Sequence, residues 1–361
     1  MDDIKKTIED DFEKVKKLSV EEYTLYRKWE EVNKEWSIKE FQRMHEIKNS
    51  IWIPESPEDY LELDPAVIPA TDTNTNLTWT LLRIFTSSMH WNPNPGRMMR
   101  FFVQDRKTKG YLGVISLGSD FISIGGRDSY IGWTYEHRLK RKMLNHTAMG
   151  SSIVPTQPLG YNYTGGKLIA LLTVSDIVEN AWNERYKEPL VGVSTTSLYG
   201  GLSQYNRLRY WKKCKSTDGQ IPLEPSEECY TKIREWMRAN HRDKLRVLQA
   251  RSHPKTAVLM FVYKTLKIKP PINNFSRGVY FCELYTNARQ FLRREDEELT
   301  EKKFDNSVHA LTEFWKERYA KNRLKSVIDS RRYSKSMLFY NELIGREWED
   351  VKSEFIQDVG R

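Results

Sequence analysis

The stretch from residue 159 to residue 182, LGYNYTGGKLIALLTVSDIVENAW, decides how the chain is expected to fold. Gly160, Gly165 and Gly166 precede apolar residues that recur at helical spacing as far as Trp182. This spacing predicts one buried helix of about five turns from Gly165 to Trp182. The first turn of such a helix presents unpaired backbone amides and the positive end of the helix dipole.

A phosphate group is the ligand that a glycine-rich helix start favours. Five residues separate Gly160 from Gly166, and Leu168 stands where a P-loop needs a hydroxyl residue, so the sequence excludes a P-loop nucleoside triphosphatase. A Rossmann G-x-G-x-x-G is also absent. A plain strand–turn–helix connection is the alternative. The residues predicted to form the phosphate cradle are Gly160, Tyr161, Thr164, Gly165, Gly166 and Lys167.

The composition predicts a globular protein with a polyanionic partner. The 361 residues are 39% hydrophobic and 30% charged, which suits a core beneath a well-solvated surface, and the net charge is +9. A basic excess of this size favours nucleic acid, with DNA as the expected partner, and a generically basic surface is the alternative. The three cysteines form no CxxC and the seven histidines form no HExxH, so no metal site is predicted.

Nothing in the sequence favours a membrane protein. The chain has no apolar run of about 18 residues, the length that a membrane helix needs. Its first residues are charged and lack the apolar core of a signal peptide. We therefore expect a cytoplasmic protein of a bacterial or phage-infected host cell.

Changes in composition along the chain predict four regions. Apolar residues at helical spacing near the N-terminus are interrupted at Ser19 and Ser37, which are candidate helix N-caps. The helical segments at the two ends could mediate a homodimer. The regions are a helical arm (1–50), a linker or extended wrap with four prolines (51–76), an α+β core (77–286) and a charged helical segment (287–361).

Within the core, local patterns predict individual elements. Residues 98–105 and 111–120 are expected to form paired strands around a turn. Residues 203–213 and 230–245 are each expected to be helical. Residues 256–266 are either a strand or a buried helix, because periodicity does not distinguish the two for a short apolar run.

Four side chains are candidates for catalysis. Arg127 and Asp128 follow a predicted turn at Gly125–Gly126, where the pair would orient a substrate or a base, and a structural ion pair is the alternative. His146 is a candidate general base, although a lone histidine is more often structural. Tyr199 follows a hydroxyl-rich strand and is the candidate proton donor.

A second set of residues suits nucleic acid. An Asn amide such as that of Asn145 can read an adenine edge. Residues 207–213 interleave bases and aromatics, which suits a phosphate backbone beside an unstacked base, and Lys316–Arg332 is a second basic run. Solvated helix faces are the alternative. The residues predicted to contact nucleic acid are Asn145, Ser197, Arg207, Arg209, Tyr210, Trp211 and Lys212.

The predicted order of strand, glycine loop, helix, strand, polar break and helix around the opening stretch resembles the central half of the Gcn5-related N-acetyltransferase fold. The resemblance implies an acetyltransferase-like mixed-sheet core, flanked here by N- and C-terminal helical segments. It also implies that the glycine loop cradles the pyrophosphate of an acyl-coenzyme A. The next strand would splay from its neighbour to admit the pantetheine arm.

Residues 111–218 more specifically resemble the core of the Druantia anti-phage A-type protein family. The shared features are R-D-x-x-I-G-W at Arg127–Trp133, a helix ending in W-x-x-R-Y, and a strand that leads to a polar loop and a Trp. Hydroxyl residues occupy Val193–Leu198 where that family has acidic ones, so chemistry that depends on those acids is not implied. The layout is also similar to phage Mom-type DNA-modification proteins, which alter the N6 amine of adenine.

These observations lead to one hypothesis and two alternatives. The hypothesis is an acyl-coenzyme A-dependent enzyme that modifies a nucleobase amine in DNA, with the base flipped into a pocket. One alternative is a non-enzymatic DNA-binding protein associated with phage defence, and the other is a phage structural or assembly protein. Coenzyme A binding and salt-sensitive DNA binding distinguish the three.

Overall fold

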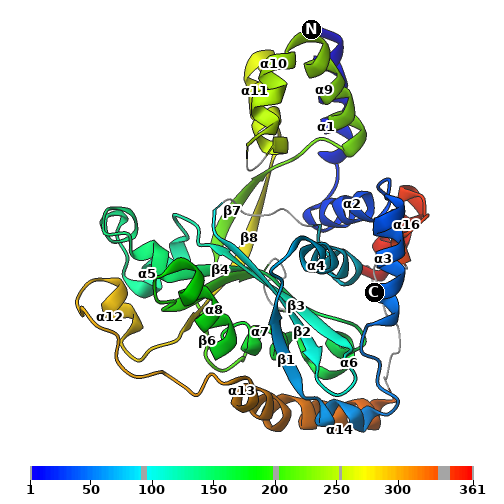
Figure 1. Cartoon of the computed structure of the whole chain (residues 1–361). Coiled ribbons are helices and arrows are strands. Elements are labelled where there is room, and N and C mark those ends of the chain that lie inside the picture. The colour runs from blue at the N-terminus through cyan, green and yellow to red at the C-terminus, as the bar shows by residue number, and fades with distance from the viewer. Residues whose placement is uncertain (1, 91–95, 198–202, 252–253, 332–341, 360–361) are drawn as a thin grey trace.

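The computed structural model describes residues 2–90, 96–197, 203–251, 254–331 and 342–359. Its centre is an eight-stranded mixed sheet in the order β1-β2-β3-β4-β5-β8-β6, with β7 paired to β8 (Figure 1). The predicted α+β class and the predicted pairing of residues 98–105 with 111–120 are confirmed. The strands are β1 (Pro65–Pro69), β2 (Met98–Asp105), β3 (Tyr111–Ser119), β4 (Thr147–Pro155), β5 (Gly192–Ser197), β6 (Trp211–Lys213), β7 (Thr217–Pro222) and β8 (Ile272–Glu283).

Helices cover both faces of the sheet. Because successive residues of a strand point to opposite faces, Phe101 and Phe102 of β2 belong to different cores. The Phe102 core contains residues of α2 (Val20–Val32), α3 (Ile38–Asn49), α4 (Thr73–Thr86) and α16 (Trp348–Val359). The Phe101 core contains residues of α7 (Gly165–Leu172), α8 (Asp176–Tyr186), α13 (Val308–Trp315) and α14 (Lys321–Ser330).

The local capping signals near the N-terminus are confirmed. Ser19 and Ser37 are the N-caps of α2 and α3, and each forms a capping box with the glutamate three residues later. None of the helices in the described ranges combines the length and the apolar character that crossing a membrane requires. Short helical turns fill the connections: η1 (Pro57–Glu62), η2 (Glu136–Lys140), η3 (Met143–His146), α6 (Leu159–Tyr163), α12 (Ala288–Leu292) and η5 (Lys316–Ala320).

The prediction of one helix from Gly165 to Trp182 is wrong, because α7 ends and α8 begins within that stretch. Asn306 explains the break. Its side-chain amide donates to the Val174 carbonyl at 3.2 Å, and its own carbonyl accepts from the Asp176 N–H at 2.8 Å. These bonds pair backbone groups that a continuous helix would have paired internally.

Two further helix predictions fail for local reasons. Residues 203–213 form turns and then β6, because Arg207 and Tyr210 take positive φ angles of 56° and 74°, which a right-handed helix does not allow. Residues 230–245 are divided between α9 (Glu227–Asn240) and α10 (Arg242–Gln249) by His241 at φ −143°.

The expected turn at Gly125–Gly126 is instead the start of α5 (Gly125–Ile131). A Cβ on Gly126 would lie 2.0 Å from the Lys215 carbonyl oxygen, so this close approach of two backbones requires glycine. The sequence left residues 256–266 open between strand and helix, and they form part of α11 (Pro254–Leu266).

A small helical subdomain, here called the head, projects from the sheet (Figure 1). It consists of α1 (Asp2–Val15), α9, α10 and α11, which share one apolar core that includes Ile8, Ile233 and Val258. The first half of β8 pairs with β7, and its second half pairs with β5 and β6, so one strand runs from the head into the central sheet.

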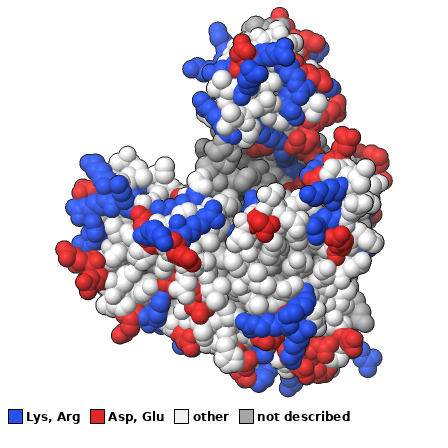
Figure 2. Space-filling view, viewed as in Figure 1, with Lys and Arg blue, Asp and Glu red and all other residues white. Residues whose placement is uncertain are grey.

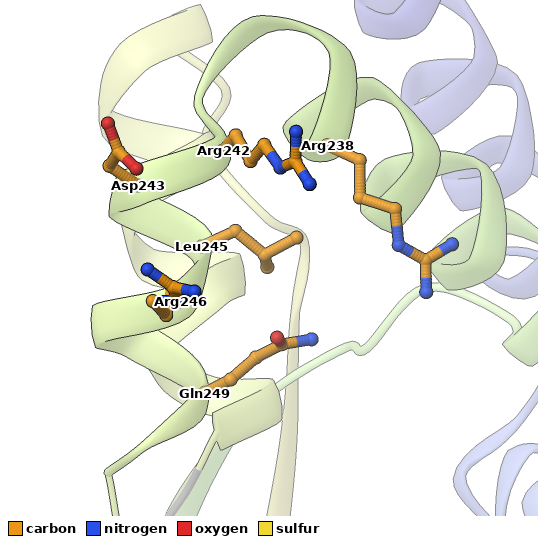
Figure 3. A pocket seen from close by; sticks show the side chains of 6 residues that line it. All are labelled: Arg238, Arg242, Asp243, Leu245, Arg246 and Gln249. Atoms are coloured by element: carbon orange, nitrogen blue, oxygen red, sulfur yellow. The ribbon is translucent and has the colours of Figure 1, made fainter.

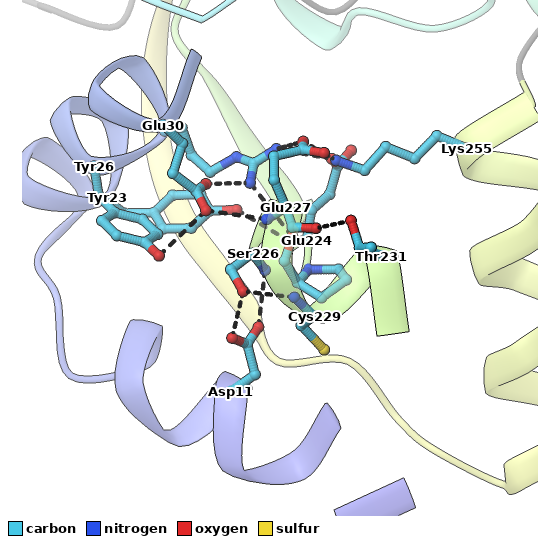
Figure 4. A network of polar contacts seen from close by, with 12 residues as sticks. Asp11, Tyr23, Tyr26, Glu30, Glu224, Ser226, Glu227, Cys229, Thr231 and Lys255 are labelled. Carbon is cyan, nitrogen blue, oxygen red and sulfur yellow. Dashed lines mark hydrogen bonds and ion pairs between the residues drawn. The ribbon is translucent and has the colours of Figure 1, made fainter. Parts of the chain in front are cut away.

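A buried polar network joins the head to α2 (Figure 4). Arg27 of α2 is 5% exposed and contacts Glu30 at 2.6 Å and Glu224 at 3.3 Å. Below it, the Asp11 carboxylate of α1 accepts from the Ser226 hydroxyl at 2.6 Å, and Ser226 is the N-cap of α9. These contacts fix the position of α1 and α9 relative to α2.

Candidate functional site

The start of α7 is covered by side chains of its own chain. A Cβ on Gly166 would lie 2.2 Å from Oε1 of Gln204, so Gly166 lets a glutamine approach the helix. Lys167 donates from Nζ to the carbonyls of Gln204 at 2.9 Å and Asn206 at 2.6 Å, and burial lowers its pKa. The Lys167 ammonium group, which the sequence led us to expect at a phosphate, is thus hydrogen-bonded to the loop after β5.

The rest of the predicted cradle is also in contact with protein. The Thr164 carbonyl accepts from the Trp315 indole N–H at 3.2 Å. A Cβ on Gly160 or Gly165 would lie 2.6 Å from the Gln157 side chain or 2.5 Å from Leu159, respectively. Tyr161 lies in α6, and its side chain falls outside what the structure describes.

Beside this helix start, β4 and β5 form a parallel pair that diverges. They share three register pairs, from Thr147–Gly192 to Met149–Ser194. Beyond these pairs the Gln204 amide donates to the Ile153 carbonyl of β4 at 2.9 Å, and Thr195 Oγ1 donates to the Gly150 carbonyl at 2.9 Å. The chain thus fills the opening between the two strands with its own side chains.

Tyr205 closes the opening further. Its side chain is 6% exposed, and burial raises its pKa to about 12. An acyl-coenzyme A does not fit this arrangement, because Gln204 occupies the position between the strands and Lys167 is bonded to the loop. A ligand could enter only if the loop carrying Gln204 moved.

Arg127 and Asp128 belong to a buried ionic cluster. Arg127 is fully buried and lies 2.5 Å from Asp120 and 2.6 Å from Asp128. Arg138 contacts the second oxygen of Asp128 at 2.9 Å, and the Ser194 hydroxyl donates to Asp120 at 2.8 Å. This geometry is that of a structural ion cluster, which ties α5 to β5 and to the turn after β3.

The R-D-x-x-I-G-W motif has a packing explanation as a whole. Trp133 lies beneath the Arg127 guanidinium at 5.2 Å, and its indole donates to the Leu292 carbonyl at 2.7 Å. Ile131 is fully buried in the same local core. The sequence does not single out Asp120, although an acidic residue directly after a buried strand is the signal that would have found it.

Asn145 and His146 lie apart from that cluster and hold a loop in place. The Asn145 amide donates to Glu188 at 3.2 Å, while Arg97 contacts Glu188 at 2.6 Å. His146 Nδ1 lies 3.1 Å from the Pro189 carbonyl, and burial lowers the pKa of the ring, which favours the neutral form. Both side chains therefore have hydrogen-bond partners within the protein.

The hydroxyl residues at the end of β5 are only partly described. Ser197 is 9% exposed, and its register partner in β8 is Gly278. Tyr199, the candidate proton donor, lies outside the described residues. Within the described ranges, no three His, Cys, Asp or Glu side chains converge as a metal-ion site.

The aromatic residues of the run 207–213 pack against the protein. Trp211 is 5% exposed, and its indole donates to the Ala170 carbonyl at 3.1 Å. Tyr210 stacks on Phe304 with ring centroids 3.9 Å apart. The basic residues Arg207, Arg209 and Lys212 are exposed.

The structure brings the two basic runs of the sequence together. The Tyr319 hydroxyl donates to the Arg207 carbonyl at 3.0 Å and accepts from the Arg209 N–H at 3.1 Å. The Arg209 guanidinium also lies 5.8 Å from the Phe314 ring. We call the exposed residues of this region the basic face: Arg207, Arg209, Lys212, Arg318 and Lys325.

Comparison with known proteins identifies the family. The model of the family described as Druantia protein DruA matches residues 11–294, which is well over half of the chain. The chain belongs to this family. A curated relative, Druantia protein DruA of Escherichia coli strain UMEA 4076-1, is 27% identical over 160 residues.

The match to the curated relative covers only part of each protein. The aligned region covers 40% of this chain and 39% of the Escherichia coli relative, so the chain spans less than half of that relative's length. No solved structure matches. The family assignment agrees with the Druantia resemblance, whereas these matches do not support the Mom-type layout.

Proposed function

We propose that the chain is a DNA-binding protein that serves anti-phage defence and contacts the phosphate backbone through the basic face. The observation that carries this proposal is the meeting of two basic runs, about a hundred residues apart in sequence, through Tyr319. Among the described residues, no carboxylate lies within ion-pair distance of Arg207, Arg209 or Arg318. Unpaired, exposed guanidinium groups bind phosphodiester oxygens with charge-assisted, bidentate hydrogen bonds.

The proposal assigns a scaffolding role to the sheet. The predicted catalytic pair Arg127 and Asp128 is buried in ion pairs, and the opening beside β5 holds Gln204. The exposed charge lies outside both places, on β6, η5 and α14 and in the turns before β6. DNA binding needs only this surface, which the chain presents without rearrangement.

The test is the salt dependence of binding to a short fluorescent DNA duplex, measured by anisotropy. The variant Arg207→Gln/Arg209→Gln/Arg318→Gln should lose about three units of slope in log K against log salt, since each phosphate contact contributes about one. The matched control Lys39→Gln/Lys48→Gln/Lys107→Gln removes the same charge from other exposed positions and should leave the slope within about one unit. Equal slopes for both variants would refute the proposal.

A second candidate function is acyl transfer to a nucleobase. It is favoured by one observation, the single parallel pair β4–β5 that diverges after three register pairs beside a glycine-rich helix start. The Gln204 side chain would have to leave for a donor to bind. Titration of the wild-type chain and of Gln204→Ala with coenzyme A tests this candidate, and no binding to either protein would eliminate it.

A further inference from the structure

The head carries a second basic site, remote from the basic face. Arg238 at the end of α9 and Arg242 and Arg246 on α10 surround a hollow of about 500 Å³. Figure 3 shows the Leu245 side chain between them and Gln249 further along α10, while Asp243, which also lines the hollow, points away from the three guanidinium groups. We call this hollow the arginine groove.

The groove has a rigid base. Leu245 is 4% exposed and belongs to the apolar core of the head. The corner between α9 and α10 is fixed by the His241 ring, which meets Trp236 edge-on at 5.0 Å and Phe261 at 5.3 Å. Arg238, Arg242 and Arg246 recur every four residues across this corner and are all exposed.

The three arginines of the groove outnumber its one acidic residue, Asp243. In the part of the chain that the structure describes, no carboxylate lies within ion-pair distance of its three arginines, whereas Lys232 and Lys255 of the same subdomain are both paired with glutamates. In Figure 2 the head is the upper lobe; Lys and Arg side chains lie over the left and centre of its visible face, and Asp and Glu side chains lie mainly along its top and right-hand edge. Three unpaired guanidinium groups around one hollow repel one another, and an anionic ligand removes that repulsion.

We propose that the arginine groove binds the phosphodiester backbone of a DNA strand, as a second contact that rests on the proposed DNA-binding function and extends it. Arg242 and Arg246 are one helical turn apart, a rise of about 6 Å. Phosphates on one strand of a duplex advance by about 3.4 Å per nucleotide along the axis and also wind around it, so the two arginines reach neighbouring phosphates of one strand. Arg238 reaches the same strand from the other side of the corner.

The shape of the site favours a strand over a membrane surface. The arginines line a hollow with a buried leucine at its floor, so they border a concave site and not a convex face. A bilayer is broad and flat, and it engages residues that spread over a convex face. Anionic lipid is therefore the alternative that the experiment must separate.

The experiment compares four full-length proteins on the same fluorescent DNA duplex. They are the wild type, the groove variant Arg238→Gln/Arg242→Gln/Arg246→Gln, the head control Lys264→Gln/Lys267→Gln/Lys269→Gln, and the basic-face variant described above. The head control removes three exposed charges at the end of α11 and just after it, so it matches the groove variant in net charge and lies in or next to the same subdomain. Circular dichroism checks that each variant is folded.

The groove variant should bind DNA at least about tenfold more weakly than the wild type, and the head control within about twofold. The inference is overturned if the groove variant and the head control bind DNA equally well, or if the groove variant keeps wild-type DNA affinity and loses only its binding to phosphatidylserine vesicles. If only the basic-face variant loses affinity, the proposed function stands and the inference fails. If only the groove variant loses affinity, the inference stands and DNA binding through the basic face fails.

Discussion

The substitution Arg127→Met tests the assignment of the ionic cluster as structural. It removes the contacts of Arg127 with Asp120 at 2.5 Å and with Asp128 at 2.6 Å, and the bond to the Phe121 carbonyl at 2.9 Å. Arg138 still pairs with Asp128, but Asp120 keeps only neutral donors such as the Ser194 hydroxyl. Because a carboxylate that is fully buried then has no cation, the expected loss is about 3–5 kcal/mol in the free energy of unfolding.

The assay is guanidinium unfolding followed by circular dichroism. The control is Arg106→Met, which breaks a single pair with Asp64 at 2.7 Å between side chains that are 52% and 51% exposed. An exposed pair of this kind contributes about 0–1 kcal/mol. Adding Asp120→Asn to Arg127→Met removes the unpaired charge and should recover part of the loss. A loss no larger than that of Arg106→Met would refute the structural assignment.

Two other predictions concern stability. Burial lowers the pKa of Lys28 to about 8 from 10.5, so the unfolded chain binds more protons between these values. The unfolding free energy of the wild type should therefore rise between about pH 8 and pH 10.5, by up to about 3 kcal/mol relative to Lys28→Met, and parallel pH profiles would contradict this. Gly126→Ala should destabilise the chain, because the new Cβ would lie 2.0 Å from the Lys215 carbonyl oxygen, whereas Gly125→Ala meets nothing within 4 Å. Equal unfolding temperatures for the two alanine variants would show that the close backbone contact at Gly126 does not destabilise Gly126→Ala.

Features that depend on neighbouring residues are predictable from the sequence. The capping boxes at Ser19 and Ser37 need only a serine and a glutamate three residues apart. The pairing of β2 with β3 follows from two strand-like runs around a short turn. Local hydrogen bonds and alternation determine these elements, so no knowledge of the rest of the chain is required.

Features that depend on distant residues are not predictable in this way. The break between α7 and α8 is made by Asn306, more than a hundred residues away, and the glycine at position 166 accommodates Gln204. A glycine-rich helix start looks the same in sequence whether a phosphate or a side chain covers it. The structure adds what the sequence could not show, namely that the Gln204 side chain covers this helix start.

The sequence predicts the spacing of the groove arginines but not the shape of the groove. Arg238, Arg242 and Arg246 are spaced by four residues, which places them along one side of a helix. The corner at His241 turns that row into a hollow, because it separates α9 from α10. The residue types are visible in the sequence, and their concave arrangement is not.

Mapping where DNA touches the chain tests the central claim most directly. The full-length protein would be cross-linked to a duplex that carries photoreactive groups on its backbone, and the modified peptides would be identified by mass spectrometry. We expect cross-links on α9 and α10 around the arginine groove and on the basic face near Arg207 and Arg318. Cross-links confined to other surfaces, or none above the level of a heparin-competed sample, would contradict the account.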